Sequence, residues 1–150
     1  MKNMSWRTAI SRNKPSAPMT FLNGQHRLAG RLLDYGCGKG FDADCFSMEK
    51  YDPHFMTKRP EGFYDTITCV YVLNVVDKKE QEEILKSIRN LLSPNGVAYI
   101  AVRRDMKEDY KTALSVQRIV KLPYPVVQEE AGHCIYMMSK YPEVENEGGN

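Results

Sequence analysis

The chain has 150 residues, which is enough for one compact domain and too few for two of ordinary size. Hydrophobic residues make up 42% of it and charged residues 27%, and this balance excludes a wholly disordered chain. With 21 Lys and Arg against 19 Asp and Glu, the whole molecule is close to neutral and is not steered toward nucleic acid by its overall charge. The apolar runs are too short to cross a bilayer, so we expect no membrane association.

The first 27 residues differ from the rest of the chain in charge. They contain five Lys or Arg and no acid, because the first acidic residue is Asp34. We treat residues 1–27 as a basic N-terminal arm that is broken by Pro15 and Pro18. It has no apolar segment of the signal-peptide kind, and the four cysteines form no C-x-x-C pair, so we expect a cytoplasmic protein with free thiols and no metal site.

The next segment alternates short strands with glycine and helix signals. Residues 31–35 predict a buried strand that ends in a glycine loop at residues 36–40. A turn or two of helix is expected within residues 41–47, followed by a brief strand at 48–51. Residues 65–73 are rich in β-branched and aromatic side chains and form the clearest strand of the chain.

A helix signal follows that strand. Asp77 is the expected N-cap and Glu80 completes a capping box. Apolar residues at helical spacing continue to position 92, the turn sequence SPNG ends the helix, and residues 97–102 form an apolar run typical of a strand covered on both faces. The order of strands and helices predicts an α/β fold with a mostly parallel sheet.

Two further strands are expected near the C-terminus, at residues 116–122 and 134–138. The residues beyond them are acidic and rich in glycine. We therefore place the folded domain at residues 28–141 and a disordered acidic tail at residues 142–150.

The glycine loop is the strongest chemical signal. The sequence GCGKG follows a strand and opens a helix, where glycines let the backbone turn sharply and approach a ligand closely. Phe41 stands where a dinucleotide fingerprint needs a small residue, and the P-loop pattern is absent. Asp34, two residues before the first glycine, favours a ligand with an ammonium or a sulfonium over a pyrophosphate.

A second acid ends the next predicted strand. Asp52 stands where a carboxylate can accept hydrogen bonds from both hydroxyls of a ribose. The alternative is that Asp52 forms an Asx turn before Pro53.

These stretches together resemble a known family. Residues 33–40 (LDYGCGKG) are similar to motif I of the class I S-adenosylmethionine-dependent methyltransferases. Residues 51–53 resemble the acidic end of their second strand, 64–70 their fourth strand, and 92–97 their turn into strand five. Three further stretches, at residues 10–16, 51–55 and 71–76, are closer to the methyltransferases associated with DNA phosphorothioation.

The resemblance implies S-adenosylmethionine as the cofactor and assigns roles to particular residues. The implied catalytic residues are Tyr71 and Asn74, at the end of the fourth family strand. Asn74 is equally well read as a cap at a helix entry, because the sequence continues NVVD where amino-methylating relatives have Asn-Pro-Pro-Tyr. The implied cofactor-binding residues are Asp34, Tyr35, Gly36, Gly38, Gly40, Asp52, Pro53, Val72 and Leu73.

The length limits this fold. Only twelve residues, 53–64, separate Asp52 from the next strand, where the family has a helix, a third strand and another helix. We therefore expect an abridged Rossmann-like methyltransferase fold: a mostly parallel sheet with an antiparallel C-terminal strand, and strand three with its helices reduced. Such a fold leaves the cofactor site open, so a second copy or a partner subunit is expected to close it.

The substrate is the least defined part. Ser11, Arg12 and Lys14 of the basic arm are candidates for contacts with a nucleic acid or nucleotide acceptor, although a small molecule and a solvated arm both stay open. The predicted function is methyl transfer from S-adenosylmethionine to an unidentified acceptor. The alternatives are an inactive cofactor-binding subunit of a complex and an enzyme that cleaves the cofactor.

Overall fold

The computed structural model describes residues 12–111 and 116–141. Its main sheet has six strands in the order β2-β1-β3-β4-β8-β7. The pairs among β1, β2, β3 and β4 are parallel, whereas β8 is antiparallel to both β4 and β7. This confirms the predicted α/β fold, with its mostly parallel sheet and antiparallel C-terminal strand. The strands span Leu32–Tyr35 (β1), Glu49–Tyr51 (β2), Tyr64–Val70 (β3), Leu92–Arg103 (β4), Val126–Glu129 (β7) and His133–Ser139 (β8).

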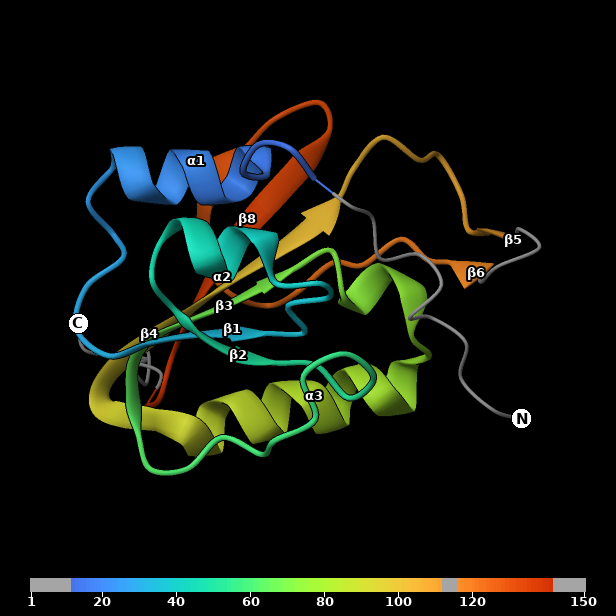
Figure 1. The fold of residues 1–150 in the computed structure, drawn as a ribbon. Coiled ribbons are helices and arrows are strands. Elements are labelled where there is room, and N and C mark those ends of the chain that lie inside the picture. Colours follow the sequence, from blue (N-terminus) through green and yellow to red (C-terminus); the bar gives the residue numbers. More distant parts are fainter. Residues whose placement is uncertain (1–11, 112–115, 142–150) are drawn as a thin grey trace, which may run out of the picture.

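Helices cover both faces of the sheet. The helices α1 (Ala17–Gly24) and α2 (Phe41–Cys45) lie on one side and α3 (Lys78–Leu91) on the other (Figure 1). The core is accordingly divided in two: Met19 of α1 packs with Ala43 of α2 and Tyr99, while Ile88 of α3 packs with Ile67. Asp77 caps α3 as predicted, because its carboxylate accepts a hydrogen bond from the Glu80 N–H at 2.8 Å.

Helix α1 lies in the segment that the sequence analysis assigned to the basic arm. Ser16 is its N-cap and accepts a hydrogen bond from the Met19 N–H, and Pro18 stands in the first turn. Proline is favourable there because its missing N–H needs no partner. Pro18 therefore starts a helix where the sequence analysis saw only an interruption, and Met19 and Leu22 are fully buried against the sheet.

The predicted loss of strand three is confirmed. Between β2 and β3, residues 53–63 contain no helix and no strand, apart from one isolated bridge of Met56 with Asp52. Strand β2 is therefore an edge strand of the sheet.

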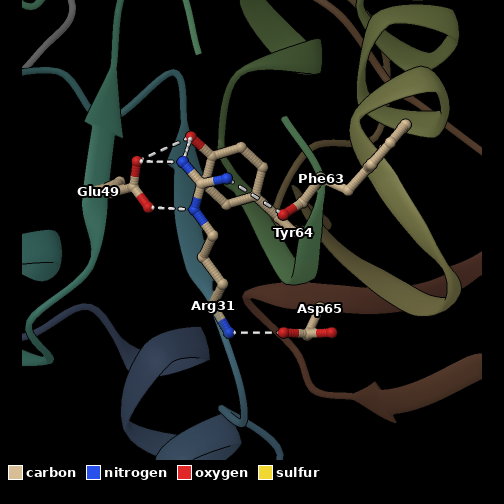
Figure 2. A network of polar contacts seen from close by, with 5 residues as sticks. All are labelled: Arg31, Glu49, Phe63, Tyr64 and Asp65. Carbon is tan, nitrogen blue, oxygen red and sulfur yellow. Dashed lines mark hydrogen bonds and ion pairs between the residues drawn. The ribbon is translucent and has the colours of Figure 1, made fainter. Parts of the chain in front are cut away.

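A polar network ties the starts of three strands to this short connection. The Arg31 guanidinium donates to both carboxylate oxygens of Glu49 at 2.7 and 2.9 Å, to the Tyr64 hydroxyl at 3.2 Å and to the Phe63 carbonyl at 3.3 Å (Figure 2). The Arg31 N–H also donates to the Asp65 carboxylate. The network joins β2, the entry to β1 and the start of β3 at the sheet edge where the family's third strand is missing.

The C-terminal strands differ from the prediction. Of the strand expected at residues 116–122, only β6 (Val116–Gln117) forms, and it pairs with β5 (Tyr110–Lys111) in a separate two-stranded sheet. Val120 is buried against the core without joining a ladder, so its apolar character reflects packing alone. The strands that were not predicted are β5 in this small sheet and β7 in the main sheet.

The start of β4 also differs from the prediction. The strand begins at Leu92, and the expected turn at residues 93–96 is an irregularity in its pairing with β3, where Tyr64 faces Leu92 and Thr66 already faces Val97. The predicted tail at residues 142–150 lies outside the described residues.

Candidate active site

The glycine loop between β1 and α2 has the backbone that its sequence predicts. Gly36, Gly38 and Gly40 have φ angles of +81°, +57° and +88°. Residues with a Cβ rarely adopt this region, so the loop requires glycine. A Cβ at Gly36 would lie 2.5 Å from the Cγ2 of Val72, which shows how closely the loop approaches the end of β3.

The loop is fastened to the end of β2. The N–H groups of Gly36 and Cys37 donate to the Tyr51 carbonyl at 2.7 and 3.0 Å. The Asp52 carboxylate accepts from the Gly38 N–H at 2.9 Å through one oxygen, and from the N–H groups of His54 and Phe55 through the other. Asp52 therefore forms the Asx turn of the alternative reading while its carboxylate stays beside the glycine loop.

A pocket of about 1090 Å³ lies at the carboxyl ends of β1, β2, β3 and β4. This is the edge at which open parallel sheets bind ligands. Ten of the residues predicted for the site line it: Arg12, Asp34, Tyr35, Gly36, Gly38, Gly40, Asp52, Pro53, Tyr71 and Val72.

The inner end of the pocket is acidic. Asp34 is buried, and its carboxylate accepts a hydrogen bond from the Thr68 hydroxyl at 3.2 Å. Burial, with a smaller contribution from the nearby Asp42, raises the pKa of Asp34 to about 7. A cationic ligand group at this place would offset the charge that burial disfavours. Among the described residues, no group of three or more His, Cys, Asp or Glu has the arrangement of a metal site.

Tyr71 lines the pocket at the carboxyl end of β3. It follows β3 directly and has a φ of +61°, a strained conformation for a bulky residue, which its backbone hydrogen bond to the Ala101 carbonyl helps to hold. Burial raises the pKa of the Tyr71 phenol, and the nearby Arg12 lowers it by a smaller amount. The phenol is therefore protonated at neutral pH and is a hydrogen-bond donor.

Two residues predicted for the site, Leu73 and Asn74, do not line the pocket. Leu73 is fully buried in the core. Asn74 is fully buried too: its amide nitrogen donates to the Arg118 carbonyl at 2.7 Å, and its oxygen accepts from the Arg103 N–H at 2.9 Å. Asn74 thus joins the end of β4 to residue 118, and this corrects its expected place beside the reacting groups.

Two of the three candidates from the basic arm lie among the described residues. Arg12 lines the pocket, Lys14 is exposed and does not line it, and Ser11 lies outside the described residues. Ser16 joins this segment to Asp42, which also lines the pocket. Its N–H and hydroxyl donate to the two carboxylate oxygens of Asp42, both at 2.8 Å.

Asp42 is a site residue that the sequence alone did not predict. Asp42 stands in the first turn of α2 and lines the pocket. The available signal was the pattern of Ser16 followed by Pro18, which marks a helix start, together with an acid in the first turn of the helix that follows the glycine loop.

An aromatic pair forms part of the pocket wall on the α3 side. The rings of Tyr35 and Tyr51 lie 4.9 Å apart between centroids, and the Tyr35 hydroxyl donates to Ser87 of α3 at 3.0 Å. The Arg59 guanidinium lies over the Tyr51 ring at 5.6 Å. Arg59 belongs to the segment that replaces strand three, so this shortened connection contributes to the pocket.

The comparisons with known proteins identify the family. A model described as a methyltransferase domain matches residues 6–141, so the chain belongs to the methyltransferase-domain family. The match covers the glycine loop, Asp52 and every strand and helix described above, and it makes the protein a methyltransferase. A search among curated proteins finds no match.

Solved structures share the fold at low sequence identity. The Burkholderia thailandensis 1,6-didemethyltoxoflavin-N1-methyltransferase, with S-adenosylhomocysteine bound, aligns with a TM-score of 0.61 at 14% identity over 91% of this chain and 78% of its own. A complex of DhpI with SAM and HEP gives 0.57 at 12% over 81% and 84%. The Synechocystis magnesium protoporphyrin IX methyltransferase with bound SAM gives 0.52 at 13% over 89% and 88%. Among the helices of the described residues, none has the length and hydrophobicity to cross a membrane.

Proposed function

We propose that this protein binds S-adenosylmethionine in the pocket at the carboxyl ends of β1 to β4 and transfers its methyl group to an acceptor that reaches Tyr71. One observation carries the proposal: the glycine loop has three positive φ angles and is hydrogen-bonded to Asp52, so a backbone cradle and a ribose-type acid form one wall. Gly36 lets this loop lie close to the end of β3, because a Cβ there would be 2.5 Å from the Cγ2 of Val72. Structural neighbours with bound S-adenosylmethionine or S-adenosylhomocysteine support the choice of cofactor.

The residues divide between the two halves of the cofactor. Asp34 and the glycine loop would hold the amino-acid half, with the ammonium near the buried carboxylate. Asp52 keeps one carboxylate oxygen bonded only to the Gly38 N–H among the described residues, so this oxygen can also accept from a ribose hydroxyl. The aromatic pair of Tyr35 and Tyr51 offers an apolar wall near the base, in place of the contacts that strand three supplies in the family.

The main requirement of methyl transfer is that the protein aligns the acceptor with the methyl group. The bound cofactor supplies a methyl carbon on a positively charged sulfur, to which an acceptor lone pair bonds as the carbon–sulfur bond breaks and its electron pair returns to sulfur. Tyr71 and Val72 bound the place where this carbon would lie, and their fixed backbone holds the acceptor in line. The Tyr71 phenol is a hydrogen-bond donor to the acceptor, and an acceptor proton can pass to solvent afterwards.

For the acceptor we propose a nucleic acid or nucleotide, as in the phosphorothioation-associated methyltransferases that residues 10–16 resemble. Arg103 at the pocket and the exposed Lys14 of the N-terminal segment support this class. We also propose a cytoplasmic protein, which its four free cysteines favour. The unpaired edge of β2 supports closure by a second copy or partner subunit.

The test is a transfer assay with methyl-labelled cofactor. The protein is incubated with separate fractions of DNA, tRNA, protein and small metabolites, and label is counted in each. We expect label in the DNA, tRNA or nucleotide-containing fraction. Methylthioadenosine or homoserine lactone as the product would instead indicate cofactor cleavage, and cofactor binding without any product would indicate an inactive subunit.

A further inference from the structure

We propose that Arg12 binds the carboxylate at the amino-acid end of S-adenosylmethionine, and that the Ser16–Asp42 contact holds Arg12 in place for this role. The inference rests on the proposed function, because it assigns a partner to one end of the proposed cofactor. It makes the N-terminal segment a determinant of cofactor specificity, since the carboxylate is what separates this cofactor from its decarboxylated form.

The segment that carries Arg12 is anchored beside the glycine loop. Ser16 is 1% exposed, and its N–H and hydroxyl bond to both oxygens of the Asp42 carboxylate, which is 9% exposed. The same Ser16 hydroxyl accepts from the Met19 N–H and so caps α1. This junction fixes the direction in which the chain enters the pocket, where Arg12 lies four residues earlier.

The buried acids of the inner pocket are complementary to the ammonium of a zwitterionic ligand. Asp34 and Asp42 are buried acids beside the glycine loop, and a cationic ammonium would compensate them. A ligand that brings an ammonium on an amino-acid end also brings a carboxylate within a few ångströms of it. That carboxylate needs a cation or an array of donors, because a buried anion without a partner is costly.

Arg12 is a cation of the pocket lining that can take this role. Within the described residues, its guanidinium has no carboxylate at ion-pair distance, whereas the neighbouring Arg103 donates to both oxygens of Asp105 at 2.9 Å. Arg12 is also close enough to Tyr71 to affect the pKa of its phenol. It lines the same pocket as the glycine loop and Tyr71, and its planar guanidinium can bind a carboxylate through two parallel hydrogen bonds.

The experiment compares two ligands by calorimetry: S-adenosylhomocysteine, which has the amino-acid end, and methylthioadenosine, which lacks it. We expect Arg12→Gln to weaken S-adenosylhomocysteine binding by roughly 10- to 100-fold and to leave methylthioadenosine binding within about twofold of the wild type. Arg12→Lys should restore part of the loss, since it keeps the charge without the bidentate geometry. Lys107→Gln removes an exposed cation that does not line the pocket and is the matched control.

The positioning role of the junction has its own readout. Ser16→Ala removes the hydroxyl donor to Asp42 and is expected to weaken S-adenosylhomocysteine more than methylthioadenosine, with little further loss when it is combined with Arg12→Gln. Equal losses for the two ligands in Arg12→Gln, or unchanged S-adenosylhomocysteine binding with a raised KM for the acceptor, would overturn the inference. If the folded wild type binds neither ligand, the proposed function itself fails, and this outcome is distinct from the other two.

Discussion

The Gly38 N–H donates to the Asp52 carboxylate at 2.9 Å, and this bond joins the glycine loop to the end of the neighbouring strand. Because the same carboxylate accepts from two N–H groups of the following turn, its position does not depend on a bound ligand. This wall of the pocket is therefore held by the protein's own contacts, although residues 53–63 form neither a helix nor a strand.

The close approach of Gly36 to Val72 predicts the effect of a single methyl group. Gly36→Ala would place a Cβ at 2.5 Å from Val72 and force an alanine to a φ of +81°. We expect it to lower the free energy of unfolding by about 1–3 kcal/mol and to abolish measurable cofactor binding, as followed by urea denaturation and calorimetry.

A control exists at the end of α1. A Cβ at Gly24 meets no atom within 4 Å, so Gly24→Ala should leave both measurements near those of the wild type. Adding Val72→Ala to Gly36→Ala should recover part of the stability by removing the clash. Wild-type binding in Gly36→Ala would show that the ligand does not approach this loop.

Asp34 predicts a pH dependence of stability. Burial raises its pKa in the folded protein to about 7, while in the unfolded chain the carboxyl titrates near its ordinary value of 3.8. Between these values the folded protein retains a proton that the unfolded chain has released, so the free energy of unfolding falls as the pH rises from about 4 to about 7 and then levels off. From pH 5 to pH 8 this contribution amounts to roughly 2–3 kcal/mol.

Asp34→Asn removes the titration and tests the assignment. Urea denaturation at pH 5 and pH 8 should show a smaller loss of stability in this variant than in the wild type, and at pH 8 the variant should be the more stable protein. Identical pH dependence in the two proteins would mean that Asp34 ionises normally.

Asn74 is predicted to matter for stability and not for chemistry. Asn74→Ala leaves the Arg103 N–H and the Arg118 carbonyl without their buried partner, and we expect a loss of about 2–4 kcal/mol in the free energy of unfolding. Cofactor binding at a temperature where the variant is folded should stay close to that of the wild type. A stable variant that binds cofactor and fails to transfer methyl would restore Asn74 as a catalytic residue.

The Arg31 network is expected to stabilise the β2 edge of the sheet. Arg31→Met removes the contacts with Glu49, Tyr64 and Phe63 at once and should lower the midpoint of thermal unfolding (Figure 2). The part of this effect that comes from the Arg31–Glu49 ion pair should be smaller at high salt, because the two side chains are 42% and 49% exposed. Arg104→Met breaks another exposed ion pair, at β7, and serves for comparison.

Sequence reasoning found the parts of this fold that local patterns specify. The glycine loop, the capped helix α3 and the apolar run within β4 each have a pattern that short-range chemistry imposes. The short interval before β3 predicted the missing strand by length alone. Helix α1 was missed because Pro15 and Pro18 were read as breaks in the chain, although Pro18 occupies the one turn that tolerates proline.

The site was predictable only in part for a related reason. Asp34, Asp52 and the glycines are adjacent in sequence to elements that define them. The bonds between Ser16 and Asp42, 26 residues apart, and between Asn74 and residue 118 depend on tertiary contacts that no local pattern encodes. Asn74 could be a cap or a site residue by sequence, and only its burial places it below the pocket.

The central claim is that the pocket beside the glycine loop binds S-adenosylmethionine through Asp52. Calorimetric titration of S-adenosylhomocysteine into the wild type and into Asp52→Ala tests it directly. We predict one site per chain in the wild type and a loss of about 1–3 kcal/mol of binding free energy in Asp52→Ala, measured while the variant is folded. A folded wild type that binds no S-adenosylhomocysteine, or an Asp52→Ala variant that binds it as tightly as the wild type, would contradict the account.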